Sequence, residues 1–247
     1  MQDMSTEYAG LVVWDVDGTL IPADLRWLRR AIARTYTLPE AAVTFPSARV
    51  HGYTDESIVV DTAVTSGISP EIAEQGVPEF HRQLARVMEA GEQELAKAQP
   101  AYLGAAATIA ALDAQGFVQT VLTGNLRPAA ELKLRVTGLS PHLDLDIGAF
   151  GSDARNRFEL PEFIAKRFAA KYGNEFHPSR TVVIGDAPND IACARHAGLH
   201  AIVVTHRATR SDLAAYSPDA IIDVLQPDTV VAAVKELVGH CPERPVH

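Results

Sequence analysis

Two aspartates, Asp15 and Asp17, follow a short apolar run and are the residues best suited to chemistry. The run at residues 11–14 is short and rich in valine, which is typical of a strand buried on both faces of a sheet. Ligands of open α/β sheets bind at the carboxyl ends of strands, where both aspartates would lie. Two carboxylates with a single residue between them in the sequence repel each other unless a cation lies between them. We therefore expect a cation-dependent site at this strand end.

A second polar group follows another predicted strand. Residues 117–122 are expected to form that strand, and Thr123, Gly124 and Asn125 come directly after it, before a helix expected at residues 128–138. The hydroxyl of Thr123 and the backbone amides of Gly124 and Asn125 would face an anion, because helix N-termini bind phosphate. This group predicts a phosphate site.

Two more aspartates follow a third predicted strand, at residues 181–184. Asp186 and Asp190 are four residues apart around a turn, a spacing that suits ligation of Mg²⁺ by carboxylate oxygens. Because parallel strands end at one edge of a sheet, we expect these aspartates beside Asp15 and Asp17. Cation ligands next to a phosphate site predict phosphoryl chemistry.

Each group also has a purely structural interpretation. An Asp-x-Asp-Gly segment can simply end a strand, and residues 123–125 can form an ordinary strand-to-helix turn. Asp186 and Asp190 can serve as turn and helix-cap residues. The chemical interpretation is favoured because all three groups fall at predicted strand ends.

Apolar spacing predicts the elements that position these residues. Residues 22–100 show a helical pattern without a confident strand, so we expect an all-helical insertion there. Beyond it strands alternate with helices, which predicts an α/β core of residues 1–21 and 101–247 with a parallel sheet covered on both faces. The expected helices are at residues 24–38, 57–65, 77–98, 104–115, 128–138, 161–172, 190–197 and 229–238. The expected strands, besides the three named above, are at residues 145–150, 201–205 and 220–224.

Length and composition are those of an ordinary globular protein. The chain has 247 residues, of which 47% are hydrophobic and 21% charged, enough for a core domain with an insertion. A formal net charge of −9 without a basic block argues against nucleic acid and anionic membranes as partners. No apolar run is long enough for a membrane span, residues 1–10 are unlike a signal peptide, and Cys193 and Cys241 have no metal or redox spacing. We therefore expect a cytoplasmic protein.

The segment Asp15-Val16-Asp17-Gly18-Thr19-Leu20 resembles the first motif of the haloacid dehalogenase superfamily, Asp-x-Asp-Gly-Thr-Leu. Thr123, at the end of its strand, resembles the second motif, and Gly185-Asp186-Ala187-Pro188-Asn189-Asp190 resembles the fourth, Gly-Asp-x-x-x-Asp. The insertion after the first motif is similar to the helical cap of the phosphoglycolate-phosphatase-like branch. This resemblance implies a Rossmann-like core with strand order 3-2-1-4-5 and an inserted all-helical cap domain.

The third motif of that superfamily is a single basic residue before the fourth, and its position here is open. Related phosphatases usually carry a Lys-Pro pair in this region, which the chain lacks. Arg157, just after the strand expected at residues 145–150, is our choice, and Arg155 is a near alternative. Lys133 is disfavoured, because it should lie more than two turns along its helix, away from the strand edge.

The resemblance also implies catalytic roles. Asp15 would be the nucleophile that forms an aspartyl-phosphate, and Asp17 would be the general acid and base. Dehalogenating relatives lack an acid at the position of Asp17, so its presence favours a phosphatase. The expected substrate is a small phosphorylated metabolite, either phosphoglycolate-like or a sugar phosphate.

Mg²⁺ and phosphate ligands follow from the same resemblance. Mg²⁺ would be held by Asp15, the backbone carbonyl of Asp17 and Asp186, while Asp190 would act directly, through water or by orienting its neighbours. The phosphoryl group would be bound by Thr123, Gly124, Asn125 and Arg157.

Several alternatives stay open. A phosphomutase of the same superfamily would use the same motifs, and a non-catalytic phosphate-binding module would keep the same fold. Residues 53–57 are typical of a helix start and also resemble a Gly-x-Thr-Asp segment of related caps, which would place Thr54 or Asp55 at the substrate pocket. The arginines between residues 26 and 34 are expected on a solvated helix face. Both a monomer and a homodimer fit the sequence.

Overall fold

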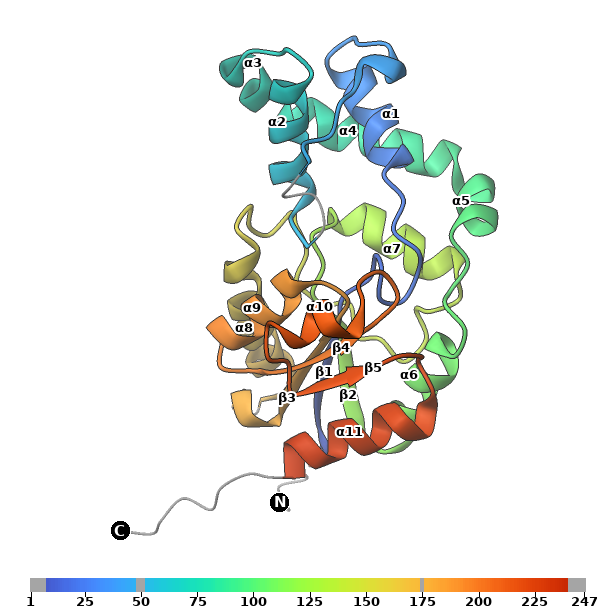
Figure 1. Ribbon diagram of the computed structural model, residues 1–247, viewed down its shortest axis with the longest axis vertical. Helices are drawn as coiled ribbons and strands as arrows, with labels where there is room; N and C mark the ends of the chain where they lie inside the picture. The colour runs from blue at the N-terminus through green and yellow to red at the C-terminus, as the bar shows by residue number, and fades with distance from the viewer. Residues whose placement is uncertain (1–7, 48–51, 174–175, 240–247) are drawn as a thin grey trace.

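Parallel strands form one sheet, and the candidate site residues leave it at a common edge. A computed structural model of the protein describes residues 8–47, 52–173 and 176–239, and Figure 1 shows how the elements are arranged. Over these residues the sheet has five strands in the order β2-β1-β3-β4-β5. The strands are β1 (Gly10–Trp14), β2 (Phe117–Val121), β3 (Thr181–Gly185), β4 (His200–Val204) and β5 (Ala220–Ile222).

The central strand β1 is buried along its whole length. Its side chains alternate between the faces of the sheet, so Trp14 packs in one hydrophobic cluster and Val13 in the other. The parallel register places Trp14 opposite Val121 of β2 and Ile184 of β3. The residues that follow these three positions, Asp15 among them, therefore meet at one edge of the sheet.

Helices cover both faces of the sheet. Apolar residues of α6, α7 and α11 pack on one face, and those of α8, α9 and α10 pack on the other. This is the α/β architecture that the sequence predicts. The bounds are α6 (Ala105–Ala114), α7 (Arg127–Val136), α8 (Leu160–Tyr172), α9 (Pro188–His196), α10 (Arg210–Ala214) and α11 (Pro227–Gly239).

The strand expected at residues 145–150 is reduced to a single parallel bridge between Leu122 and Ala149. The residues before this bridge form a turn, in which the N–H of Gly148 donates to the carbonyl of Leu145 at 3.3 Å. The prediction of a full strand was therefore wrong. The bridge nevertheless lies beside β2, at the outer position that the order 3-2-1-4-5 gives to a third strand, and the predicted order is confirmed.

Residues 22–100, hereafter the helical insertion, contain helices and no strand in their described part. Figure 1 shows the insertion beyond the carboxyl ends of the strands, with α7 lying between it and the sheet. Its elements are α1 (Arg26–Thr35), the 3₁₀ helix η1 (Glu40–Ala42), α2 (Asp55–Thr65), α3 (Pro70–Gln75), α4 (Val77–Ala90) and α5 (Glu92–Ala98). None of the described helices, here or in the core, is long and apolar enough to cross a membrane.

The helical insertion has a hydrophobic cluster of its own. Trp27, Phe80 and Leu84 are buried in it, and the cluster extends onto the α7 side chain of Leu132. The helix expected at residues 77–98 breaks at Gly91, where a Cβ atom would lie 2.3 Å from Cζ3 of Trp27. The missing side chain at this break thus makes room for the indole ring.

We expect the helical insertion to depend on this cluster for its stability. Phe80→Ala should lower the free energy of unfolding by about 3–5 kcal/mol, because it leaves a cavity where a fully buried ring stood. The matched variant Ile72→Ala, in which a half-exposed side chain is truncated, should change that free energy by less than about 0.5 kcal/mol. Urea unfolding followed by circular dichroism measures both, and equal losses would contradict a packed core in the insertion.

Candidate active site

The first aspartate of the 15–17 pair continues the buried strand. The backbone N–H of Asp15 donates to the carbonyl of Ile184 at 2.9 Å, and the Asp15 side chain is almost completely buried. The chain then turns sharply through Gly18, whose φ is +94°. A Cβ atom on Gly18 would lie 2.4 Å from a carboxylate oxygen of Asp186, so this turn requires glycine. The turn therefore brings Asp15 and Asp186 to one place.

Arg157 supplies a buried positive charge to this place. It begins the 3₁₀ helix η2 (Arg157–Glu159), and its Nη2 donates to Oδ1 of Asp15 at 2.9 Å and to Oδ1 of Asp190 at 2.5 Å. These two carboxylates raise the pKa of the guanidinium against the opposing effect of burial. Its Nε has no hydrogen-bond partner among the described residues. Arg157 is therefore part of the site and not a surface charge.

Asp190 has both oxygens engaged by the protein. Its Oδ2 accepts from the backbone N–H groups of Asp186, at 3.1 Å, and Ala187, at 2.9 Å, while Oδ1 accepts from Arg157. The carboxylate thus caps the first turn of α9 and fixes the loop that carries Asp186. Among the described residues, the carboxylate of Asp186 has only long contacts, from Thr19 at 3.4 Å and from Arg207 at 3.3 Å. Asp190 is therefore placed to orient its neighbours.

Three carboxylates share this buried space. One oxygen of each of Asp15, Asp186 and Asp190 lies within 4.8 Å of the others. Burial, together with the negative charge of Asp190, raises the pKa of Asp15 to about 7 and that of Asp186 to about 8, although Arg157 acts in the opposite direction. Buried carboxylate oxygens whose charge one arginine only partly balances are a donor set that fits a hard divalent cation.

The loop after β2 lies against the helical insertion. Oγ1 of Thr123 accepts from the backbone N–H of Asn125 at 3.2 Å, and Gly124 passes so close to the insertion that a Cβ atom would lie 2.0 Å from the carbonyl oxygen of Tyr53. The N–H of Asp55 donates to the Gly124 carbonyl at 2.7 Å, and Oδ2 of Asp55 accepts from the N–H of Leu126 at 2.9 Å. The backbone N–H of Asn125, which was expected to face a phosphate, therefore donates within its own loop instead.

Lys133 lies at the strand edge, contrary to expectation. Its Nζ is 2.5 Å from Oδ2 of Asp17 and 2.9 Å from Oδ1 of Asn125, and the side chain is buried. Helical side chains lean toward the helix N-terminus, and the long lysine chain spans the two turns of α7 that the prediction counted as distance. The prediction that Lys133 lies away from this edge was wrong.

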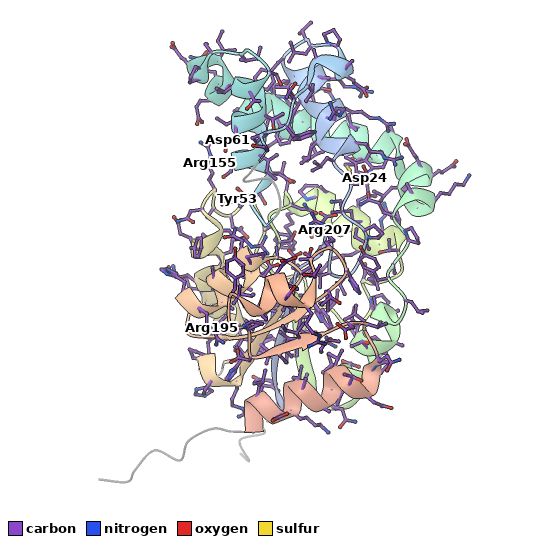
Figure 2. All side chains as sticks on the ribbon, in the orientation of Figure 1. Asp24, Tyr53, Asp61, Arg155, Arg195 and Arg207 are labelled. Carbon is purple, nitrogen blue, oxygen red and sulfur yellow. The ribbon has the colours of Figure 1, made fainter. Side chains whose placement is uncertain are left out.

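Arg155 has a different environment. Its side chain is largely exposed and pairs with Glu74 at 2.8 Å and with Glu56 at 3.5 Å, both in the helical insertion. Figure 2 shows it where the insertion meets the core, while the labelled Arg207 lies closer to the strand ends. The structure therefore brings Arg157 and Lys133, but not Arg155, to the candidate site.

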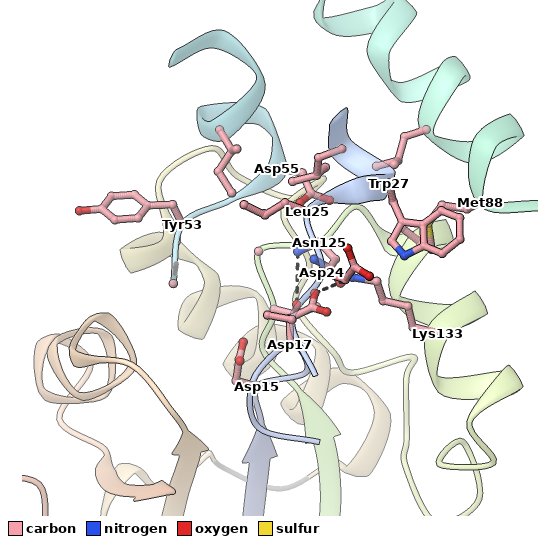
Figure 3. A pocket seen from close by; sticks show the side chains of 18 of the residues that line it. Asp15, Asp17, Asp24, Leu25, Trp27, Tyr53, Asp55, Met88, Asn125 and Lys133 are labelled. Carbon is pink, nitrogen blue, oxygen red and sulfur yellow. Dashed lines mark hydrogen bonds and ion pairs between the residues drawn. The ribbon is translucent and has the colours of Figure 1, made fainter. Parts of the chain in front are cut away.

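One pocket lies between the sheet edge and the helical insertion, and Asp15, Asp17, Lys133, Arg157 and Arg207 are among its lining residues. Asp15 and Asp17 stand at its base, and Figure 3 shows Lys133 reaching toward Asp17 beneath the insertion. Sequence reasoning missed Arg207, which follows β4 without any motif around it. For Asp55 the sequence did contain a signal, because Thr54 and Asp55 were expected at a helix start. The Thr54 side chain indeed caps α2.

Comparison with known proteins gives concordant results. The model of the haloacid dehalogenase-like hydrolases matches residues 12–195, and a second, HAD-hydrolase-like model matches residues 160–237. The chain is 26% identical over 240 residues to the probable phosphatase IndB of Dickeya dadantii (strain 3937), covering 92% of this chain and 94% of that protein.

Solved structures share the fold. A hydrolase from Pseudomonas syringae aligns with a TM-score of 0.66 at 16% identity, over 92% of this chain and 99% of its own. A predicted phosphoglycolate phosphatase from Haemophilus somnus 129PT aligns with a TM-score of 0.62 at 22% identity, over 90% of this chain and 97% of its own.

The buried carboxylates predict a pH-dependent stability that a divalent cation reverses. Asp15 and Asp186 have pKa values raised above their ordinary value of 3.8, so their contribution is fully present below about pH 4 and is lost as pH rises through 7 and 8. Without divalent cations, the melting temperature should therefore fall between pH 5 and pH 8. Added Mg²⁺ should raise it more at pH 8 than at pH 5, because the cation binds the ionised carboxylates. Thermal scans with EDTA or Mg²⁺ test this, and a Mg²⁺ effect that is larger at pH 5 would contradict it.

Proposed function

This chain belongs to the haloacid dehalogenase-like hydrolase family, and on that premise we propose that it is a Mg²⁺-dependent phosphatase that hydrolyses a small phosphomonoester. One observation carries the proposal. Asp15 lies at the base of a pocket and is buried against Arg157, and Asp17 beside it contacts Lys133. A carboxylate in contact with an arginine suits nucleophilic attack on an anionic phosphoryl group, because the positive charge offsets the repulsion.

Asp15 is the proposed nucleophile. One of its oxygens attacks phosphorus, the bond from phosphorus to the leaving oxygen breaks, and an aspartyl-phosphate forms on Asp15. Asp17 donates a proton to the leaving oxygen. Asp17 then takes a proton from water as the water oxygen attacks phosphorus, and inorganic phosphate leaves while the Asp15 carboxylate is restored. Lys133, 2.5 Å from Asp17, holds that carboxylate in place through both steps.

The donor set fits a cation, and we assign its ligands among the buried oxygens. Asp15, Asp186 and the backbone carbonyl of Asp17 would hold Mg²⁺, and Asp190 would orient Asp186 and Arg157 without binding the ion itself. A bound Mg²⁺ supplies positive charge that neutralises phosphoryl oxygens and favours the ionised nucleophile.

The phosphoryl group would be bound by residues from separate loops. Arg157 has its unpartnered Nε available, and Thr123 offers its hydroxyl. Gly124 and Asn125 line the same pocket, so the backbone of Gly124 and the side chain of Asn125 complete the set. Each donor is held by protein contacts before substrate arrives, which limits the reorganisation needed in the transition state.

We further propose that the helical insertion acts as a cap domain on a core formed by residues 1–21 and 101–247. The insertion lines one side of the pocket, and the core supplies the reacting groups on the other. Closure of the cap would exclude bulk water from the aspartyl-phosphate and position the substrate.

Substitution of the two aspartates tests the proposed roles. Asp15→Asn should abolish release of inorganic phosphate from a broad panel of monophosphates in the presence of Mg²⁺, because the amide is no nucleophile. Asp17→Asn should slow release by about 10²–10⁴-fold through loss of acid–base catalysis. Circular dichroism confirms that each variant is folded. The phosphatase proposal fails if the unmodified protein with Mg²⁺ releases no phosphate from the panel.

Two outcomes would point to other functions. Isomerised sugar phosphate without net phosphate release would identify a phosphomutase. A beryllium fluoride adduct formed on a protein without turnover would identify a non-catalytic phosphate-binding module.

Arg157 and Arg155 form a matched pair for testing the third basic residue. Arg157→Met should lower kcat by about 10²–10³-fold, because the nucleophile and the phosphoryl group lose their shared positive charge. Arg155→Met removes the same type of side chain two residues earlier, from an exposed ion pair, and should leave kcat nearly unchanged. Steady-state phosphate release measures both variants. The opposite ranking would assign the role to Arg155.

A further inference from the structure

The pocket has two chemically different sides. The core side carries the reacting carboxylates and the charged groups around them, while the helical insertion supplies an apolar wall (Figure 3). The wall consists of Leu25, Trp27, Leu28, Ile58, Leu84 and Met88. A substrate with its phosphoryl group at Asp15 would therefore hold its leaving group against apolar side chains.

The positive charges of the pocket all lie on the core side. Among the described lining residues the cations are Lys133, Arg157 and Arg207, and each already contacts a site carboxylate: Lys133 contacts Asp17, Arg157 contacts Asp15 and Asp190, and Arg207 contacts Asp186. These three cations surround the place where the phosphoryl group would bind, and they would attract it. A second anionic group on the substrate would meet none of them on the insertion side.

The charged lining residues that the insertion does contribute are acidic. Asp24 and Asp55 both line the pocket, and Asp55 is buried to 3% exposure beside the loop at Gly124. The charge of Asp24 is paired with Arg26 at 2.6 Å, so Asp55 is the carboxylate that an anionic leaving group would meet. Such a group would also lose its own hydration against the wall, and both effects oppose binding.

The polar atom of the largest wall residue is not available to a substrate. Nε1 of Trp27 donates to Oε1 of Gln99 at 2.6 Å, and Gln99 in turn donates to the carbonyl of Pro22. The indole is thereby fixed, and its ring, which is 1% exposed, borders the pocket from within the hydrophobic cluster of the insertion. Met88 stands beside it with a flexible thioether that packs well against aromatic rings.

The arginines of α1 do not supply the missing charge. Arg26 pairs with Asp24 at 2.6 Å and with Glu94 at 2.8 Å, Arg30 also pairs with Glu94, and Arg29 donates to the backbone carbonyls of Glu40 and Val43. None of these arginines lines the pocket. The part-exposed side chains of Arg26 and Arg30 agree with the expected solvated helix face.

We propose that the substrate's leaving group is uncharged and has an apolar or aromatic body that packs on the wall formed by Trp27, Met88 and their neighbours. The inference rests on the proposed phosphatase function and narrows it. Acids such as phosphoglycolate, and substrates with a second phosphate, are disfavoured. Simple polyol phosphates are disfavoured as well, because they have no apolar body to pack against the wall.

Substrate pairs in which one member carries an additional carboxylate test this with the unmodified protein. Benzyl phosphate is compared with 4-carboxybenzyl phosphate, and 2-hydroxyethyl phosphate with phosphoglycolate, so that each pair keeps a similar alcohol as leaving group. With Mg²⁺ present, kcat/KM should be about tenfold or more higher for the neutral member of each pair. It should also be higher for benzyl phosphate than for 2-hydroxyethyl phosphate.

Asp55→Asn provides a second measurement. The amide oxygen can still accept from the N–H of Leu126, so the loop contact is kept while the charge is removed. The ratio of kcat/KM between benzyl phosphate and its carboxylated partner should fall several-fold. In Asp228→Asn, an exposed aspartate in the first turn of α11, the ratio should not change.

The possible outcomes separate this inference from the proposed function. Equal or greater kcat/KM for the carboxylated members overturns the inference and leaves the phosphatase function standing. A higher kcat/KM for 2-hydroxyethyl phosphate than for benzyl phosphate overturns the inference that the leaving group has an apolar or aromatic body. A protein that releases phosphate from none of the four compounds, nor from a wider panel, overturns the proposed function itself.

Discussion

The contact of Arg157 with Asp15 and Asp190 is the interaction on which the rest of the site depends. Parallel pairing of β1 with β3 brings aspartates from both strand ends into a buried space, where their mutual repulsion would otherwise oppose folding. One guanidinium joins two of them and leaves the third, Asp186, with long contacts only. The architecture thus holds a partly unbalanced negative charge at a fixed place, which is the condition for binding a cation and then a phosphoryl group.

The loop after β2 joins this centre to the helical insertion. At the start of α2 the N–H of Asp55 donates to the carbonyl of Gly124, and the Asp55 carboxylate accepts from the N–H of Leu126. Lys133 extends from the next helix back to Asp17. A residue of the insertion therefore supports the same loop that carries Thr123. The insertion and the strand-end loops therefore form the pocket together, and a change in the position of α2 would shift the loop after β2.

Much of this organisation could be predicted from the sequence because it depends on short-range patterns. The buried run before Asp15, the strand before Asp186 and the alternation of strands with helices fix which edge collects polar residues. Side-chain reach could not be predicted in this way. Lys133 was misplaced since its distance was counted along the helix axis, and Arg207 follows a strand without any pattern. The strand expected at residues 145–150 did not form because residues 145–148 make a turn, in which the N–H of Gly148 donates to the carbonyl of Leu145.

The long separation between partners in the centre has a consequence for biosynthesis. Arg157 and Asp15 are 142 residues apart, and β1 pairs with strands that are made more than a hundred residues after it. On a ribosome, β1 emerges first and waits without partners while the complete helical insertion, with its own hydrophobic cluster, follows it. The insertion is thus available to fold early, and Asp15 acquires its counter-charge only after residue 157 of the 247 has been made. Shorter chains therefore contain Asp15 but not the arginine that it contacts.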